Sequence, residues 1–278
     1  MADYLVVVSL YFHSGSLDHI GPFARCVEDI AIALDILQGE DERDPVCRKI
    51  PLEPCLPQIN RGIGAIRIAI ADDYFTQKAT PEALAAVIRV PSALGVNNYV
   101  TIPEAHRARA AAFLITACEG ANLHLEKLRT RSQDFDPATR DRFLAGALIP
   151  SSWYVQAQRF RRWDRDRVKE IFQYVDVIIA PTTPIPAPMI EQNTMVLDGE
   201  EILVRPHLGL FTQPLSFIGL PVLSVPVWDN ASLPLGVQLI AGPDNEVLIL
   251  RVAKVLENMG IGNNFTFNAQ RYTSGFTQ

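Results

Sequence analysis

The chain has 278 residues, a net charge of −6 at pH 7 and a pI near 5.4, with 48% apolar and 20% charged residues. These values are ordinary for a globular protein with a sizeable core, arranged as one long domain or two small ones. The acidic balance disfavours nucleic acid and anionic membranes as partners, because both attract basic proteins.

The first residues combine an apolar run with a polar heptapeptide. Residues 5–11 are apolar, but the run is too short and lacks the basic flank of a signal peptide or membrane span. The heptapeptide is "HSGSLDH" (13–19), which holds the residue types of a Ser-His-Asp site. Catalytic triads gather their members from distant parts of a chain, because adjacent side chains diverge. We therefore interpret the segment as a polar connector, with catalysis as the alternative.

The next elements alternate between helix and strand. The spacing of apolar residues in 21–39 predicts an amphipathic helix, with Pro22 in its first turn and Gly39 at its end. Four prolines make 42–62 an extended surface loop. Strands are predicted at 65–72 and 98–102, and helices at 80–95 and 103–120; Thr80 caps the former, which Pro91 kinks or ends. This order predicts an α/β fold, a mixed β-sheet with helices on both faces.

Residues 137–173 are predicted to be mostly helical, and the stretch from 156 to 175 carries five arginines. A nucleic-acid surface is one interpretation. An amphipathic helix is favoured, because Asp164, Asp166 and Glu170 neutralise much of the charged face. Four apolar side chains would then supply its core side: Phe160, Trp163, Ile171 and Phe172.

The last third holds three apolar strands and a closing helix. The run "VDVIIAP" (175–181) is typical of a strand covered on both faces, and the loop after it is placed to line a ligand crevice. Asp198-Gly199 predicts a hairpin. Strands follow near 222–228 and 233–242, then a helix at 244–260 and a tail at 261–278.

Common metal and phosphate motifs are absent from the sequence. The five histidines form no metal-binding pattern, and there is no phosphate-binding glycine loop and no Gly-x-Ser-x-Gly elbow. Ser224 is predicted to be a strand residue rather than a nucleophile. The four cysteines form no Cys-x-x-Cys pair, which indicates a reducing, cytoplasmic setting. We expect no metal, no organic cofactor and no membrane attachment.

Four stretches, in order, resemble the amidase signature hydrolases. They are "SLDHIGPFARCVEDIAIALDILQGEDERDP", "VDVIIAPTTPIPAP", "FTQPLSFIGLPVLSVPV" and "LPLGVQLIAGPDNEVLILRVAKVLE", spread over residues 16–257. Two further stretches, "EGANLHLEKLRTRSQDFDPATRDRFLAGALIP" and "VRPHLGLFTQPLSFIGLP", resemble the branch that includes 1-carboxybiuret hydrolases. The resemblance implies hydrolysis of a C–N amide bond in a small urea-derived or carboxylated amide, without a cofactor. It also implies that "HSGSLDH" is a connector.

The resemblance further implies a catalytic Ser-Ser-Lys triad, which this sequence does not show. The family's motifs for it lie upstream of the segment that matches residue 16, and residues 1–15 contain no lysine, no Gly-Gly-Ser and no Ser-Ser pair. The expectation is therefore one incomplete domain over 1–278, with an atypical start at 1–15, no catalytic residue and no activity alone. The alternatives are a non-catalytic subunit that completes an active site with a partner chain, and a truncated gene product.

Substrate-binding candidates lie in the loops around the apolar strands. Arg205 could grip a carboxylate or carbonyl with its guanidinium, or form a surface salt bridge. His207 and Gln213 could bind substrate, or bond backbone in a turn-rich segment. The expected partners are a small amide substrate, and a second copy or a small subunit, because a sheet without its first strands would leave "VDVIIAP" and "LPVLSVPVW" prone to association.

Overall fold

The computed structural model describes residues 14–40, 42, 47, 51, 53–228 and 233–261. The apolar run at 5–11, His13 and nearly all of the tail at 261–278 lie outside these residues. The strands are β1 (Ile68–Ala71), β2 (Tyr99–Val100), β3 (Val177–Pro181), β4 (Thr194–Leu197), β5 (Glu200–Leu203), β6 (Val222–Val227) and β7 (Leu235–Ala241). The α-helices are α1 (Val27–Leu37), α2 (Pro81–Leu94), α3 (Ala105–Leu123), α4 (Leu125–Arg131), α5 (Pro137–Ala147), α6 (Ser151–Ile171), α7 (Val204–His207), α8 (Gln213–Ile218) and α9 (Glu246–Asn258). Short 3-10 helices are η2 (Leu56–Gln58), η3 (Asp73–Thr76) and η4 (Ser132–Asp134).

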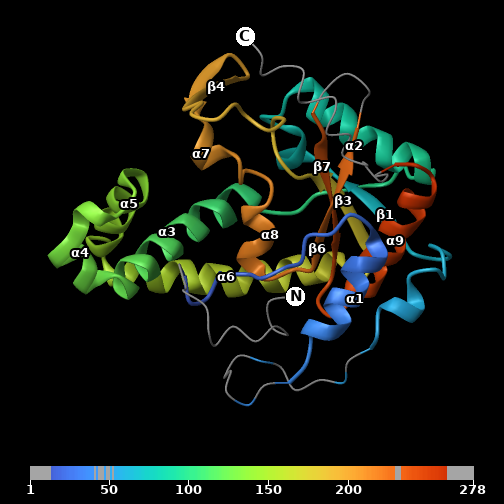
Figure 1. Cartoon of the computed structure of the whole chain (residues 1–278), viewed down its shortest axis with the longest axis horizontal. Coiled ribbons are helices and arrows are strands. Elements are labelled where there is room, and N and C mark those ends of the chain that lie inside the picture. The colour runs from blue at the N-terminus through green and yellow to red at the C-terminus, as the bar shows by residue number, and fades with distance from the viewer. Residues whose placement is uncertain are drawn as a thin grey trace, which may run out of the picture.

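The main sheet is mixed, with the strand order β2-β1-β3-β7-β6. Figure 1 labels β1, β3, β7 and β6 of this sheet. Strands β2, β1 and β3 are parallel, and β7 runs antiparallel to both β3 and β6. Strand β3 is therefore paired on both sides, whereas β6, which carries most of "LPVLSVPVW", is the last strand of the described sheet. Its Pro226 is compatible with an edge position, because proline cannot donate a ladder hydrogen bond.

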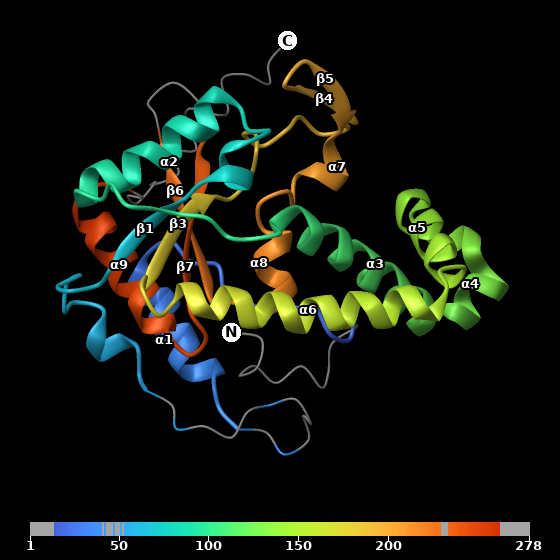
Figure 2. The ribbon, with the colours of Figure 1, turned by 180° about the vertical axis from the view of Figure 1, so that it is seen from behind.

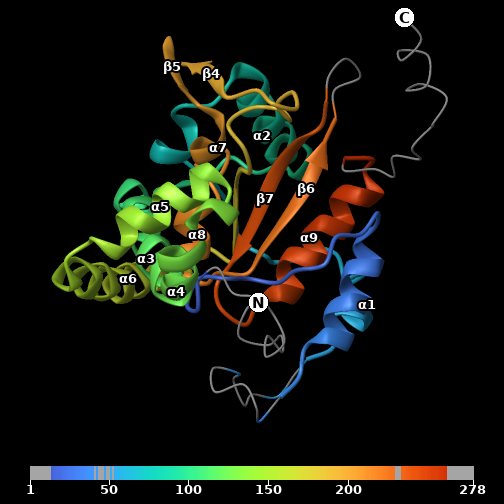
Figure 3. The ribbon, with the colours of Figure 1, turned by 60° about the vertical axis from the view of Figure 1, so that its left-hand side comes forward.

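Two apolar layers cover the sheet, and alternate residues of β3 serve one layer or the other. Val177 and Ile179 pack with α1, α2 and α9, while Ile178 and Ala180 pack with α3, α6 and α8. Figure 3 shows α1 and α9 on one side of β6 and β7, with α3, α6 and α8 on the other. All four side chains are fully buried, which confirms the mixed α/β fold with helices on both faces and the doubly covered strand.

Helix α1 differs from the prediction in its start, and helix α2 in the effect of its proline. Helix α1 starts at Val27 instead of near Pro22, with the Cys26 sulfur as its cap, accepting from the Asp29 N–H at 3.4 Å. Helix α2 starts at its Thr80 cap as expected, but it continues through Pro91. Only three further residues follow before Gly95 ends α2 in the left-handed conformation at φ 69°, so Pro91 disturbs only the last turn.

The Asp198-Gly199 hairpin forms between β4 and β5, as the sequence predicts. Both turn residues have positive φ, 51° for Asp198 and 79° for Gly199, which a two-residue turn with twisted strands requires. The hairpin projects beside α7, away from the sheet (Figure 1).

A small lobe, which we define as residues 125–147 (α4, η4 and α5), lies at the far end of α3 and α6 (Figure 2). Its own core contains Leu128 and Phe143, with Ala121 of α3. Helices α3 and α5 approach closely, since a Cβ at Gly146 would lie 2.1 Å from the Ala117 carbonyl oxygen.

Helix α6 is amphipathic, but two of its residues face opposite to the prediction. Asp164, expected on the charged face, is only 2% exposed, and Trp163, expected in the core, is 42% exposed. Trp163 instead stacks on Phe160, with ring centroids 5.6 Å apart. The helix phase is set by the sheet-facing Ala157 and Val168, which leaves Asp164 on the same buried face.

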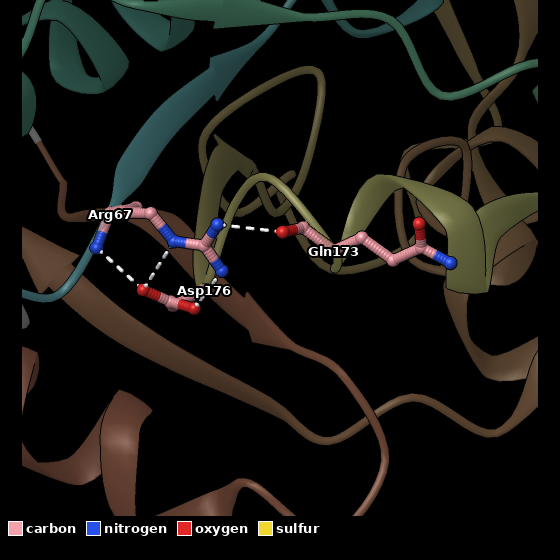
Figure 4. Close-up of polar contacts among 3 residues, drawn as sticks. All are labelled: Arg67, Gln173 and Asp176. Carbon is pink, nitrogen blue, oxygen red and sulfur yellow. Dashed lines mark hydrogen bonds and ion pairs between the residues drawn. The ribbon is translucent and has the colours of Figure 1, made fainter.

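An ion pair joins the starts of β1 and β3 (Figure 4). The Arg67 guanidinium donates to both carboxylate oxygens of Asp176, at 3.1 and 2.6 Å, and to the Gln173 carbonyl at 2.7 Å. The hydrogen bond from Arg67 lowers the pKa of Asp176. This contact ties the start of β1 to the turn between α6 and β3.

Candidate functional site

The serines of "HSGSLDH" anchor the segment to a carboxylate on α3. Glu119 accepts hydrogen bonds from the hydroxyl of Ser14, the hydroxyl of Ser16 at 2.7 Å and the backbone N–H of Ser16 at 3.1 Å. Tyr154 of α6 donates to the same carboxylate at 2.8 Å. Burial alone would raise the pKa of Glu119, but these hydrogen bonds outweigh it and hold the pKa below its usual range.

Two further polar residues of this segment contact its own backbone. His19 places its Nδ1 2.6 Å from the Leu17 carbonyl. Asp18 closes a turn, accepting from the Ser14 N–H at 3.0 Å. The described residues of the segment thus form a turn that is held by Glu119, in keeping with a connector rather than a triad.

Ser224 lies on β6, as predicted, and its hydroxyl is 2.8 Å from the Thr182 hydroxyl. Gln238 of β7, within the motif "LPLGVQL", is buried and donates to the Pro181 carbonyl at 2.7 Å and the Phe211 carbonyl at 3.2 Å. These bonds tie the end of β3 to the segment before α8. From the residues alone, Gln238 stood out only as a member of that motif.

Arg205 forms a surface ion pair with the small lobe. Its side chain is 67% exposed and donates to Asp136 Oδ1 at 2.9 Å. Asp136 also caps α5 by accepting from the Thr139 N–H; this bond, followed by the bond from Arg205, lowers the pKa of Asp136. The structure thus places Arg205 in the surface salt bridge that the sequence left open, and a role toward substrate stays a prediction.

Arg109 of α3 bonds to one of the other two candidates, Gln213, and to the residue before the second, His207. Arg109 Nε donates to Gln213 Oε1 at 3.0 Å, and its Nη2 donates to the Pro206 carbonyl at 2.8 Å. His207 Nδ1 lies 2.8 Å from the Leu203 carbonyl. Whether His207 and Gln213 bind substrate stays a prediction, but both belong to one neighbourhood, in which the sequence did not single out Arg109.

A cavity of about 220 Å³ opens in this neighbourhood. Its wall combines Lys78, His106, Arg109 and His207 with Tyr74, Gln77 and Leu210. The Tyr74 hydroxyl donates to the Leu210 carbonyl at 2.8 Å, and burial raises the pKa of Tyr74 to about 12, against a smaller lowering by the Arg109 charge. The cavity lies beyond the carboxyl end of β1 and at the first turns of α3, where α/β sheets commonly bind ligands.

Within the described part of the chain, no three His, Cys, Asp or Glu side chains gather as metal ligands, and no helix is long and apolar enough to cross a membrane. The four cysteines are unpaired. Burial, followed by the Asp35 charge, raises the pKa of Cys55 to about 12, so this thiol is a packing residue rather than a nucleophile.

The Amidase family profile matches residues 9–250, and the chain therefore belongs to the amidase signature family. It is 47% identical over 248 residues to AtzE, a component of the 1-carboxybiuret hydrolase of Pseudomonas sp. (strain ADP), a match that covers 88% of this chain and 54% of that protein. It is 32% identical over 273 residues to one subunit of the glutamyl-tRNA(Gln) amidotransferase of Roseiflexus castenholzii, covering 88% of this chain and 55% of the relative. The chain thus spans about half the length of the curated relatives it matches.

Solved structures show the same fold. One, described as an unexpected vestigial protein complex that reveals the evolutionary origins of an s-triazine catabolic enzyme, has a TM-score of 0.92 and 44% identity. That match covers 95% of this chain and 58% of the other. The crystal structure of an amidase, at 23% identity and a TM-score of 0.78, supports the fold alone.

Proposed function

We propose that this chain is part of an amidohydrolase that hydrolyses a C–N amide bond in a small urea-derived or carboxylated amide. The observation that carries the proposal is the similarity to the 1-carboxybiuret hydrolase component, at 47% identity over 88% of this chain. The relative's name supplies the substrate class, and the family supplies the reaction, in which a serine attacks the amide carbonyl.

We place the nucleophile and its base outside these 278 residues. The sequence contains five lysines, none of them in the family's catalytic motif, and no Gly-Ser-Ser core. In this proposal the chain supplies the wall of the substrate pocket, built from the loop after β3 and the segment before β6.

The edge of the sheet supports this arrangement. Strand β6 ends the described sheet, and a groove of about 520 Å³ runs between β6, the segment 19–27 and α9. An unpaired strand edge is a template for another strand. We propose that the part of the protein equivalent to the remainder of the relatives docks here and brings the catalytic groups with it.

A second candidate is a subunit that completes an active site with a separate partner chain. It is favoured by the solved relative that is described as a protein complex. The two candidates share the docking edge and differ in whether the catalytic groups arrive on the same polypeptide.

The test compares the chain alone with the chain joined to, or co-expressed with, a polypeptide that matches the remaining part of the relatives. Ammonia release is measured from 1-carboxybiuret, biuret and a simple aryl amide. We expect turnover only in the completed protein, because loss of a triad removes about 10⁶-fold of the rate.

The control is a pair of serine variants in the isolated chain, Ser224→Ala on β6 and Ser216→Ala on α8. Turnover by the isolated chain that one of these substitutions abolishes would show that the nucleophile lies within the 278 residues. Activity on the aryl amide alone would instead reject the urea-derived substrate class.

A further inference from the structure

The wall of the cavity beside α3 is rich in basic side chains. Four of its wall residues are basic, Lys78, His106, Arg109 and His207, and none of the wall residues is acidic. A volume of about 220 Å³ corresponds to about seven water molecules. The site therefore fits a small anion rather than a peptide or a nucleic acid.

Two acidic residues close to the cavity in the sequence have partners of their own. Glu104 pairs with Arg107 at 3.2 Å on α3, and Asp73 Oδ1 accepts from the amide of the wall residue Gln77 at 2.9 Å. No ion pair to Lys78 or Arg109 occurs among the residues that the structure describes. Lys78 and Arg109 thus give the wall a positive charge that favours an anion from solution.

Arg109 is held in place by two hydrogen bonds, and its other N–H groups can still donate to a ligand. Its guanidinium is fixed by Gln213 and the Pro206 carbonyl and lies over the Phe113 ring, 5.1 Å from the centroid. These contacts use two of its five N–H donors, and the described residues offer no acceptor to the other three. A fixed guanidinium with spare donors suits a carboxylate, whose two oxygens accept parallel N–H bonds.

His207 also lines this cavity, and one of its ring nitrogens has a defined hydrogen bond. The Leu203 carbonyl can only accept, so Nδ1 of His207 carries the hydrogen of that 2.8 Å contact. Its Nε2 has no hydrogen-bond partner in the described part of the chain, so it can meet a ligand as an acceptor in the neutral ring or a donor in the protonated ring.

We propose that this cavity binds the carboxylate of a small organic acid, with Arg109 as the principal contact, Lys78 as a second positive charge, and His106 and His207 as polar wall residues. The proposal rests on the proposed function only in identifying that acid as the carboxylated amide substrate. His207 and Gln213 were predicted from the sequence to bind substrate. In this proposal His207 contacts the ligand, whereas Gln213 is a positioning residue that holds Arg109.

The test is direct binding to the 278-residue chain without turnover. Malonate is the probe, and malonamide is its uncharged analogue of nearly the same shape. Isothermal titration gives the affinities, and the histidine ring signals in NMR spectra report the place of binding. Arg109→Gln should weaken malonate binding about 10- to 100-fold, the value of a charge-assisted hydrogen bond.

Two further variants distinguish binding in the cavity from attraction to the overall charge of the protein and from loss of folding. Lys78→Gln removes an exposed cavity cation without disturbing the Gln213 contact, and should also weaken malonate binding. Arg107→Gln removes the same charge two residues away on α3, outside the cavity wall, and should change the affinity less than twofold. Malonamide should bind equally weakly to all forms.

Equal malonate affinity in the unmodified chain, Arg109→Gln and Lys78→Gln would overturn the proposal. So would an Arg107→Gln loss as large as that of Arg109→Gln, which would mean unspecific attraction, and so would inorganic phosphate binding more tightly than malonate. The malonate experiment and the hydrolysis assay are independent tests. A negative malonate result would not contradict amide hydrolysis by the completed protein, and absence of hydrolysis would not contradict malonate binding.

Discussion

Glu119→Gln is predicted to loosen the N-terminal connector from α3 and α6. The substitution keeps the shape of the side chain and removes its charge. The carboxylate accepts from two serine hydroxyls, the Ser16 N–H, the Tyr154 hydroxyl and, at 3.5 Å, the Gln158 amide, and all five are donors in this arrangement. An amide presents an N–H₂ group to some of these donors, so at least one contact is lost and the others become neutral bonds.

The magnitude follows from the difference between charged and neutral hydrogen bonds. A bond to a charged group contributes about 1.5–3 kcal/mol and a neutral one about 0.5–1.5 kcal/mol, so each bond loses about 1 kcal/mol. Because Glu119 is partly exposed to solvent, we expect the total loss of folding free energy to be at the low end, about 2–3 kcal/mol. For a chain of this size that is a decrease in Tm of about 3–5 °C.

The assay is thermal and urea unfolding between pH 3 and pH 8, with the exposed Glu126→Gln of α4 as the matched control. Because the folded-state pKa of Glu119 is lowered, its contribution is present above the pKa of the unfolded chain and is lost as pH falls through the folded-state value. The gap between the unmodified chain and Glu119→Gln should therefore close in acid. A loss below about 0.5 kcal/mol at pH 7, or a gap that is independent of pH, would refute the reasoning.

Two further substitutions test the packing and the charge of the helical layer. Gly146→Ala should destabilise the chain by about 1–3 kcal/mol in urea unfolding, since its Cβ would lie 2.1 Å from the Ala117 oxygen, whereas Ala145→Val on the exposed face should cost less than about 1 kcal/mol; equal effects would contradict the close approach. Asp164→Asn should raise Tm at pH 8 and leave it nearly unchanged at pH 4. Burial, then the Glu104 charge, raises the pKa of Asp164 to about 7, so ionisation of the unfolded chain costs stability as pH rises from about 4 to 7; a Tm difference equal at both pH values would count against this.

The elements that the sequence predicted best are those with strong local signals. The apolar run at 175–181 became β3, and Asp198-Gly199 became the hairpin turn, because each is decided by residues that are adjacent in the chain. The start of α1 was misplaced because a distant contact decides it. The Val27 N–H is satisfied by Glu257 of α9 at 2.9 Å, and no local pattern around Pro22 contains that partner.

Only part of the candidate site could be predicted from the sequence, because distant contacts assemble the rest. His207 and Gln213 lie six residues apart, and the turn-rich sequence between them singles out both. Arg109, which joins Gln213 to the cavity, comes 104 residues earlier, on a helix whose alanine-rich pattern indicates packing alone. A signal was present in the His106 and Arg109 of that helix's first turns, since basic groups beside a strand end are candidates for binding an anion.

The projection of α3 and α6 toward the small lobe has a consequence for how such chains can differ in shape. Helix α6 has 21 residues and is about 31 Å long, whereas α9, which packs on the sheet along its length, has 13. The lobe carries its own core at the far end of the two helices. Matching insertions or deletions of about seven residues, roughly two turns, in α3 and α6 would carry the lobe outward or inward with little rotation. Descendants of one ancestral chain could thus acquire arms of different reach while the sheet and its two layers stay the same.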